Sequence, residues 1–320
     1  MQPDVSFVIA AYNAEGDITR AIESALAQHG VSVEVIVVDD CSRDRTVEVA
    51  RAFPPEQVKV IALDRNRGPG GARNAGLDAA TGRWISVLDS DDTVRPDRLR
   101  RMIDRAQAAG ASIAVDNIEV MEGEDGARQV MFDRDFLDKL PEIDLATFIG
   151  GNIMFEGRFS FGYLKPIFER AFVESTALRY DEVLRIGEDY MLFARALAMG
   201  GRCIVEPRPG YIYHIRGGSI SRVMELRHVE AMLEADAAFL RTHALDPRAL
   251  AAQARRTRSL HQAASFLLMV SQLKERAPLK AAGTALRDPA ALKHLRMPIA
   301  ARMRRLASLL QPAGAATRAG

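Results

Sequence analysis

The chain has 320 residues, 48% hydrophobic and 27% charged, which is enough to bury a sizeable core in one or two domains. Its two cysteines are too few for a disulfide framework and indicate a reducing compartment. The N-terminus lacks the basic segment of a cleaved signal peptide, and no apolar run approaches the ~20 residues of a membrane-spanning helix. We therefore expect a cytoplasmic protein without membrane spans.

The net charge of +1 conceals an uneven distribution. Residues 248–320 carry 14 basic and 2 acidic side chains, whereas the rest of the chain carries 29 basic and 40 acidic ones. An acidic body with a basic tail predicts that the tail contacts something anionic, either a membrane surface or a nucleic acid. Phe266 is the only aromatic residue of the basic region, so nucleic-acid binding is not expected.

Predicted strands and helices alternate from residue 4 to about residue 120. The strands are short apolar or β-branched runs, expected at residues 5–10, 33–38, 58–63, 84–88 and 112–117. The intervening helices are expected to begin near residues 17, 44, 72 and 98. This order predicts an α/β fold with a mostly parallel sheet that is covered by helices on both faces.

The second half of the chain is less regular. Within residues 121–180, the segments 150–152 and 159–163 are expected to be loops that shape a pocket. A helix is expected at 186–199 and a short strand at 211–214. From residue 222 onward the pattern is helical. We expect a catalytic domain over residues 1–221, divided near residue 120, and a basic helical region over 222–320.

Polar residues follow four of the predicted strands. Ligands of parallel sheets bind at the carboxyl ends of the strands, so these residues predict one shared pocket. They are Asn13, Asp39, Asp40, Asn66 and the segment Asp89-Ser90-Asp91-Asp92.

The segment from Asp89 to Asp92 is the most informative of these. Three carboxylates this close repel one another, and each disfavours ionisation of the others. A divalent cation relieves the repulsion, and such a cation is often held by one or two carboxylates together with substrate phosphates. The segment predicts a metal–diphosphate site with Asp91 as the leading ligand and with Asp89 and Asp92 as supporting ligands. The alternative for Asp92 is that it caps the following helix.

Five segments resemble, in order, the motifs of the family 2 glycosyltransferases, which have the Rossmann-like GT-A fold. They are residues 6–13, residues 36–46, residues 66–76, residues 88–92 with Pro96, and Gly187-Glu188-Asp189. Cys41 stands where glycine is common in the family. The likeness covers residues 5 to about 221, and the basic helical extension lies outside it.

The resemblance implies roles for individual residues. Asp189 would be the general base, and Asp91, Asp89 and His214 would bind Mg²⁺ or Mn²⁺. The residues implied in binding the donor or acceptor are Ala11, Tyr12, Asn13, Asp39, Asp40, Asn66, Arg73, Asp89, Ser90, Lys165, Glu188 and Arg216.

Several of these roles have structural alternatives. Arg73 follows a glycine-rich turn at a helix start, where an anion is favoured. Asp40 is expected to orient its loop rather than to contact the donor. Lys165 is either a ligand of the acceptor or diphosphate, or a solvated lysine. His214 is either a ligand or a structural residue, and Glu188 with Asp189 would also suit an acidic first helical turn.

The resemblance implies an inverting enzyme that moves a hexose from a nucleotide-diphosphate sugar, with a UDP-sugar expected. The acceptor would be a polysaccharide or lipid-linked oligosaccharide. Two alternatives stay open: a sugar nucleotidyltransferase and a non-catalytic nucleotide-sugar-binding protein. The first would have a glycine-rich, lysine-ended loop where this chain has residues 11–14, and the second would lack the base, whereas Asp189 is present.

Residues 299–310 of the basic tail have an amphipathic pattern. The apolar residues Ile299, Met303, Leu306 and Leu310 share one helical face. The segment would either rest on an anionic membrane at the inner face of the cell, as a peripheral contact, or pack on the catalytic domain.

Overall fold

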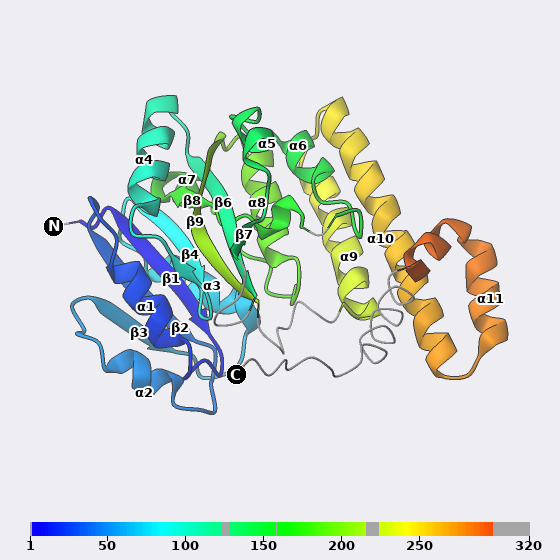
Figure 1. The fold of residues 1–320 in the computed structure, drawn as a ribbon, viewed down its shortest axis with the longest axis horizontal. Coiled ribbons are helices and arrows are strands. Elements are labelled where there is room, and N and C mark those ends of the chain that lie inside the picture. Colours follow the sequence, from blue (N-terminus) through cyan, green and yellow to red (C-terminus); the bar gives the residue numbers. More distant parts are fainter. Residues whose placement is uncertain (1, 123–127, 158, 216–223, 297–320) are drawn as a thin grey trace, which may run out of the picture.

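The computed structural model describes residues 2–122, 128–157, 159–215 and 224–296, and places one curled sheet at the centre of the molecule (Figure 1). The strands are β1 (Val5–Ala11), β2 (Val33–Asp39), β3 (Val58–Ala62), β4 (Trp84–Asp89), β5 (Thr93–Val94), β6 (Ile113–Glu122), β7 (Arg128–Val130), β8 (Ile167–Glu169) and β9 (Cys203–Ile215). Their order is β3-β2-β1-β4-β8-β6-β9-β5, with β7 paired to β6.

The sheet has a parallel half and a mixed half. Strands β3, β2, β1 and β4 are parallel neighbours. Strand β8 then runs antiparallel to both β4 and β6, and parallel pairing returns between β6 and β9. The parallel half arises from the strand–helix alternation of the first 90 residues, because parallel neighbours need a crossover between them.

The helices cover both faces of the sheet. They are α1 (Ile18–Leu26), α2 (Thr46–Arg51), α3 (Gly68–Ala79), α4 (Arg98–Ala109), α5 (Arg134–Asp138), α6 (Leu145–Gly150), α7 (Arg170–Ser175), α8 (Glu188–Ala198), α9 (Leu226–Thr242), α10 (Pro247–Lys274) and α11 (Pro278–Arg287), with 3-10 turns η1 (Phe161–Tyr163) and η3 (Pro289–Leu295). Alternate side chains of β1 enter different cores: Phe7 and Ile9 pack with α1 and α4, whereas Val8 packs with α3 and α8.

Two elements differ from the sequence prediction. Strand β9 has 13 residues and begins at Cys203, well before the expected strand at 211–214. Pro207, Pro209 and Gly210 obscure it in the sequence, and register shifts in the β6–β9 pairing accommodate them. Helix α3 begins at Gly68, so the glycine-rich segment forms its first turn and not a separate loop.

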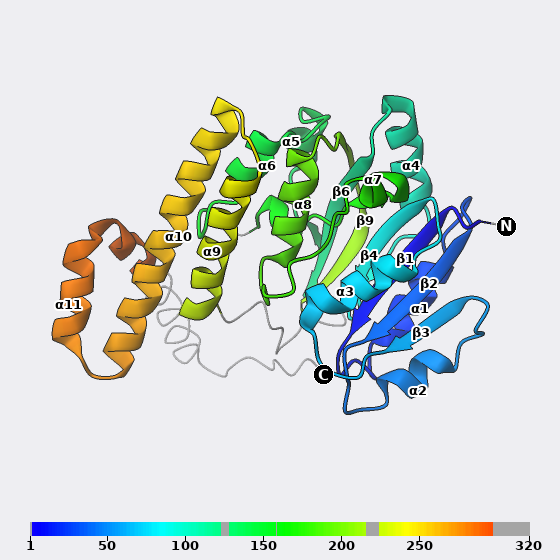
Figure 2. The same cartoon turned by 180° about the vertical axis from the view of Figure 1, so that it is seen from behind.

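Helices α9 and α10 pack beside α6 and α8 (Figure 2). A buried cation joins them: Arg256 of α10 lies 2.9 Å from Asp236 of α9 and donates to the carbonyl of Asn152. The Arg256 guanidinium also stacks 3.5 Å from the ring centre of Tyr190 in α8. The described start of the basic region therefore packs on the body of the protein, while residues 299–310 lie outside the described residues.

Within the described parts of the chain, no helix combines the length and the apolar character needed to cross a membrane.

Candidate active site

Five charged side chains meet where β4 ends and α8 begins. The Arg73 guanidinium lies 2.7 Å from Asp89, 2.7 Å from Glu188 and 3.0 Å from Asp189. The Lys165 ammonium lies 2.7 Å from the second oxygen of Asp89 and 2.8 Å from the second oxygen of Asp189. Two cations thus bridge three carboxylates, and we refer to these five residues as the charge cluster.

Because the side chains of the charge cluster are largely buried, their charges strongly affect one another's pKa values. Arg73 and Lys165 are both buried. Burial lowers the pKa of Lys165, but the charges of Asp189 and Asp89 outweigh it and hold that pKa well above its usual range. Burial raises the pKa of Asp89, and the charges of Lys165 and Arg73 reverse this and hold it well below its usual range.

The cluster keeps a net negative charge, because two cations face three carboxylates. Burial, and then the charge of Asp189, raises the pKa of Glu188. Burial, and then the charges of Asp89 and Asp91, raises the pKa of Asp92 well above its usual range, so Asp92 is not counted in this excess. A divalent cation brought by a ligand would offset it.

Arg73 is directed differently from the sequence prediction. Its guanidinium forms ion pairs with the three carboxylates of the cluster and lies 5.3 Å from the ring centre of Tyr180. Arg73 therefore holds the cluster together and does not face an anion at the start of α3. The glycines serve packing, since a Cβ on Gly70 would lie 2.8 Å from the carbonyl oxygen of Asp181.

Asp92 is a fully buried structural residue. Its carboxylate accepts a hydrogen bond from the Tyr211 hydroxyl at 2.7 Å and another from the backbone N–H of His214 at 2.8 Å. The residue that precedes α4 is Asp97. The alternative that Asp92 caps this helix is therefore wrong, because its carboxylate fixes β9 to the end of β4.

Asp91 presents the open carboxylate of the segment. It is partly buried, and no described residue forms a salt bridge with it, although its backbone carbonyl accepts from Arg20 at 2.8 Å. Burial, and then the charge of Asp89, raises the pKa of Asp91. Ser90 lies in the turn between the two aspartates.

His214 lies beside this segment. Its Nε2 is 3.0 Å from the hydroxyl of Thr93, and its backbone is fixed by Asp92. Arg216, predicted to bind the donor diphosphate, lies outside the described residues.

The residues present fit a magnesium or manganese ion only when a ligand completes the shell. Among the described residues no group of three or more His, Cys, Asp or Glu side chains is arranged around a metal position. Both oxygens of Asp89 are already paired with cations, which leaves Asp91 as the principal oxygen donor and His214 nearby. One protein carboxylate with diphosphate oxygens is a common way of holding Mg²⁺.

Asp39 provides an unsatisfied acceptor at the end of β2. It is only 2% exposed, and one oxygen accepts from the backbone N–H of Ser42 at 3.0 Å. Its other oxygen has no hydrogen-bond partner among the described residues. A buried acceptor without a partner needs an explanation, and a ligand donor is one.

The other residues predicted to bind the nucleotide surround this strand end. Ala11 is buried at the end of β1, and the exposed Tyr12 follows it. The Asn13 side chain accepts a hydrogen bond from the backbone N–H of Arg43 at 2.9 Å. The backbone of Asn13 has a positive φ of 51°. Asn13 thereby ties the ends of β1 and β2 together.

Asp40 and Asn66 hold the start of α3. The Asp40 carboxylate accepts from the backbone N–H groups of Arg67 and Gly68, at 2.6 and 2.8 Å. Asn66 donates to the carbonyl of Asp40 at 3.0 Å. Both side chains therefore organise the loop beside Asp39.

Two residues with structural roles at the site were not singled out from the sequence. Tyr211 accepts from the backbone N–H of Asp89 while donating to Asp92. Arg98 forms a fully buried ion pair with Asp116 and donates to the carbonyl of Lys165 at 2.7 Å. Tyr211 alternates with Tyr213 in a strand pattern, whereas nothing in the sequence marks Arg98 as buried.

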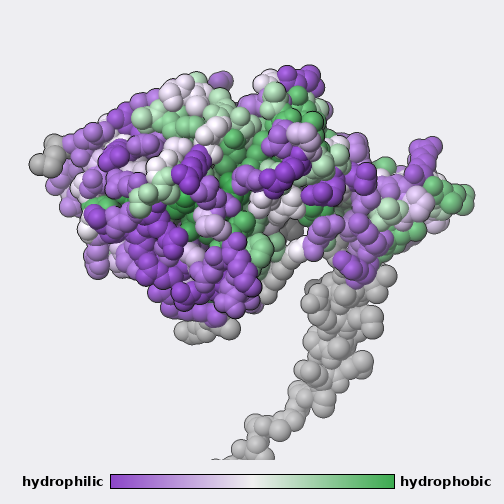
Figure 3. Space-filling model, turned by 90° about the horizontal axis from the view of Figure 1, so that it is seen from above, coloured by the Kyte–Doolittle hydropathy of each residue, from purple (hydrophilic) through white to green (hydrophobic). Residues whose placement is uncertain are grey.

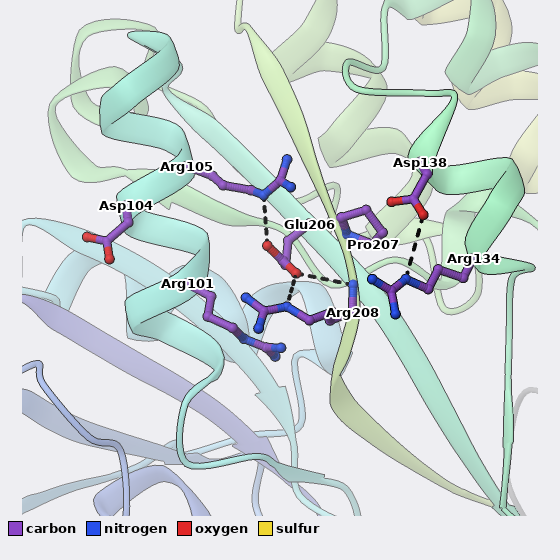
Figure 4. Close-up of a pocket in the computed structure, with 8 residues that line it drawn as sticks. All are labelled: Arg101, Asp104, Arg105, Arg134, Asp138, Glu206, Pro207 and Arg208. Atoms are coloured by element: carbon purple, nitrogen blue, oxygen red, sulfur yellow. Dashed lines mark hydrogen bonds and ion pairs between the residues drawn. The ribbon is translucent and has the colours of Figure 1, made fainter.

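A separate cavity of about 330 Å³ lies between α4, α5 and the first half of β9 (Figure 4). Three of its four arginines are paired inside it: Arg105 and Arg208 with Glu206, and Arg134 with Asp138. None of the predicted site residues lines it. We therefore do not assign it to the candidate active site.

Comparisons with known proteins agree with this geometry. The model of glycosyl transferase family 2 matches residues 6–172. The chain is 63% identical to the succinoglycan biosynthesis protein ExoO of Rhizobium meliloti, over 96% of this chain and 88% of the relative. It is 37% identical to ExoU of the same organism, over 90% and 84% of the two chains.

Solved structures support the fold. Staphylococcus aureus TarS in complex with UDP-GlcNAc matches with a TM-score of 0.61 at 21% identity, over 83% of this chain and 71% of that one. The mannosyltransferase PcManGT of Pyrobaculum calidifontis, in complex with GDP-Man and Mn²⁺, matches with a TM-score of 0.61 at 18% identity, over 95% and 81%. The predicted GT-A fold is confirmed.

Proposed function

Because this chain belongs to glycosyltransferase family 2, we propose that it transfers a hexose from a UDP-sugar to a growing bacterial exopolysaccharide, with inversion at the anomeric carbon. Family membership makes it a glycosyltransferase and sets aside the sugar nucleotidyltransferase. The observation that carries the finer proposal is the position of Asp189, held by Arg73 and Lys165 beside Asp89.

Asp189 would act as the general base. As the acceptor hydroxyl oxygen forms its bond to the anomeric carbon, the bond from that carbon to the diphosphate oxygen breaks, and the hydroxyl proton passes to the Asp189 carboxylate. The proposal assigns no carboxylate as a covalent nucleophile. A single base supports one displacement, and therefore inversion.

Asp91, with His214 nearby and Asp89 behind it, would hold Mg²⁺ or Mn²⁺. A bound ion of this kind supplies Lewis-acid stabilisation of the leaving diphosphate. Lys165 and Arg73 keep Asp89 ionised and oriented, so the negative field at Asp91 is in place before the donor arrives. The Mn²⁺ complex of PcManGT supports metal dependence in a protein of the same fold.

The unsatisfied oxygen of Asp39 would accept a hydrogen bond from the base or ribose of the donor. Ala11, Tyr12 and Asn13 surround the same strand end and would line the nucleotide pocket. The TarS complexes with UDP and UDP-GlcNAc support a uridine nucleotide, although they match this chain at only about one residue in five.

The acceptor would be a saccharide or a lipid-linked saccharide at the inner face of the cell membrane. The similarity to two succinoglycan biosynthesis proteins supports a polysaccharide product. The basic C-terminal region supports a position close to an anionic surface.

Release of the nucleoside diphosphate from a panel of nucleotide sugars tests the proposal. Each sugar is supplied with Mn²⁺ and with lipid-linked saccharides extracted from a strain that makes exopolysaccharide. We expect one UDP-sugar to be consumed, only when metal and extract are both present. Preference for a different nucleotide would overturn the donor assignment, and turnover that survives a chelator would overturn the metal assignment.

A further inference from the structure

The outermost helix of the described structure, α11, has an apolar face that no other described element covers. Leu279 and Leu286 are 88% and 82% exposed, the highest values among the large hydrophobic residues described. They are seven residues apart and thus share one face of the helix, with the exposed Ala282 between them. Ala281, the residue before Ala282, is buried.

We propose that this face of α11, here called the leucine face and defined by Leu279, Ala282 and Leu286, inserts into the surface of an anionic lipid bilayer. The inference rests on the proposed function at the inner face of the membrane and names the part of the fold that makes the contact. Figure 3 shows hydrophobic residues beside hydrophilic ones at the end of the molecule that α11 forms.

Basic side chains border the leucine face. Lys280 and Arg287 directly follow the two leucines. Residues 274–296 contain six Lys and Arg residues against Glu275 and Asp288, and residues 297–320 add four arginines and no acidic residue. Leucines with flanking cations are the composition of an interfacial helix, in which acyl chains take the apolar side chains and anionic headgroups attract the basic ones.

The same charges disfavour a second copy of the chain as the partner that covers the leucine face. Packing two leucine faces together would bring Lys280 and Arg287 of one copy near the same cations of the other. Like charges at a contact lower its stability, whereas an anionic surface complements them. The charge pattern therefore selects lipid over self-association.

Co-sedimentation of the full chain with phosphatidylcholine vesicles, with and without phosphatidylglycerol, tests the proposal. We expect binding to the vesicles that contain phosphatidylglycerol, weakened by salt. The double variant Leu279→Ser/Leu286→Ser should lower the partition coefficient by about tenfold or more, because two leucines lose their burial in lipid. Both positions are exposed, so unchanged thermal unfolding should show that the fold is intact.

Leu250→Ser is the matched control. Leu250 is 48% exposed near the other end of α10, and its substitution should leave vesicle binding unchanged. Equal binding by the double variant and the wild type would overturn the proposal. A dimer of the wild type in sedimentation velocity that the double variant loses, without vesicle binding, would also overturn it and identify a second copy as the occupant.

Vesicle binding is measured without donor, which separates this inference from the proposed function. The double variant should retain the wild-type affinity for UDP with Mn²⁺ in titration calorimetry. If vesicle binding is absent while the wild type transfers sugar, the docking proposal fails alone. If the wild type binds vesicles but no sugar nucleotide is consumed, the proposed function fails alone.

Discussion

The ammonium of Lys165 lies 2.8 Å from Oδ2 of Asp189. The same ammonium lies 2.7 Å from Asp89, so one buried cation links the proposed base to the end of β4. Arg73 repeats the link through the other oxygens of both carboxylates. The base is thereby oriented by two cations from elements that are far apart in the sequence.

Replacing Lys165 should damage the rate of transfer more than donor binding. In Lys165→Met, Asp189 keeps only Arg73, and a misplaced base of this kind can lower kcat by roughly 10²-fold. The KM for the donor should change by only about threefold, because the proposed donor contacts lie on the Asp39 side of the site. Steady-state kinetics with varied donor and acceptor measure both quantities. An unchanged kcat would contradict the positioning role, and partial recovery in Lys165→Arg would support it.

Asp91→Asn should remove metal-dependent turnover. The wild type should lose activity in a chelator and regain it with Mn²⁺ or Mg²⁺, whereas we expect Asp91→Asn to keep less than about 1% of the rate at any metal concentration. Asp104→Asn, on the solvent side of α4, is the control and should behave as the wild type. Titration calorimetry with UDP and Mn²⁺ measures the accompanying loss of metal affinity.

The raised pKa of Asp91 predicts how this affinity depends on pH. Burial and the charge of Asp89 make the carboxylate take up a proton at a higher pH than an ordinary aspartate does. Protons therefore compete with the metal, and the affinity for Mn²⁺ in the presence of UDP should fall as the pH is lowered into the acidic range. An affinity that stays constant there would show that Asp91 is not a ligand.

Arg98→Met should destabilise the fold strongly. Arg98 and Asp116 are both fully buried, 2.9 Å apart. Burial raises the pKa of Asp116, and Arg98 opposes this effect. Loss of one partner leaves a buried charge unpaired and lowers the free energy of unfolding by about 3–5 kcal/mol. Urea denaturation measures it, and a loss below about 1 kcal/mol would contradict the account. Arg100→Met, which removes an exposed ion pair with Asp104, is the matched control.

Glu34 should contribute stability that acid removes. Burial raises the pKa of this carboxyl, and hydrogen bonds from Ser6, Thr81 and Gly82 outweigh it, so the net pKa lies below the usual value. A lowered folded-state pKa gives stability that is present above the unfolded-state pKa and is lost as the pH falls through the folded-state pKa.

Glu34→Gln is the corresponding variant. It should cost about 1 kcal/mol in the free energy of unfolding at neutral pH, a modest value because the carboxylate is partly exposed to water. The difference from the wild type should shrink as the pH falls below the usual range of glutamate. Urea denaturation across pH measures this, and a difference that grows in acid would contradict the assignment.

The sequence was sufficient for the parallel half of the sheet and for the grouping of polar residues at its carboxyl edge. Residues 5–10 and 33–38 are continuous, largely apolar runs. Asn13 and Asp39 come after them in the sequence and lie together because parallel strands end at one edge of the sheet. The GT-A fold that the motifs implied is confirmed.

The internal pairing of the site was not readable from the sequence. Arg73 and Asp189 are 116 positions apart, and Asp92 and Tyr211 are 119 apart. Hydrophobic periodicity reports which face of an element is buried, but not which charged side chains meet across loops. For this reason Arg73 was expected to favour an anion at the start of α3 and Asp92 was a candidate cap, whereas both side chains are paired inside the protein. The functional roles of the site residues remain predictions.

The rate of sugar transfer by Asp189→Asn tests the central claim most directly. The variant keeps the size of the side chain but cannot accept the acceptor proton. We predict that single-turnover transfer from the UDP-sugar falls by about 10³-fold, while calorimetry shows the wild-type affinity for UDP with Mn²⁺. Transfer within about tenfold of the wild-type rate would show that Asp189 is not the base.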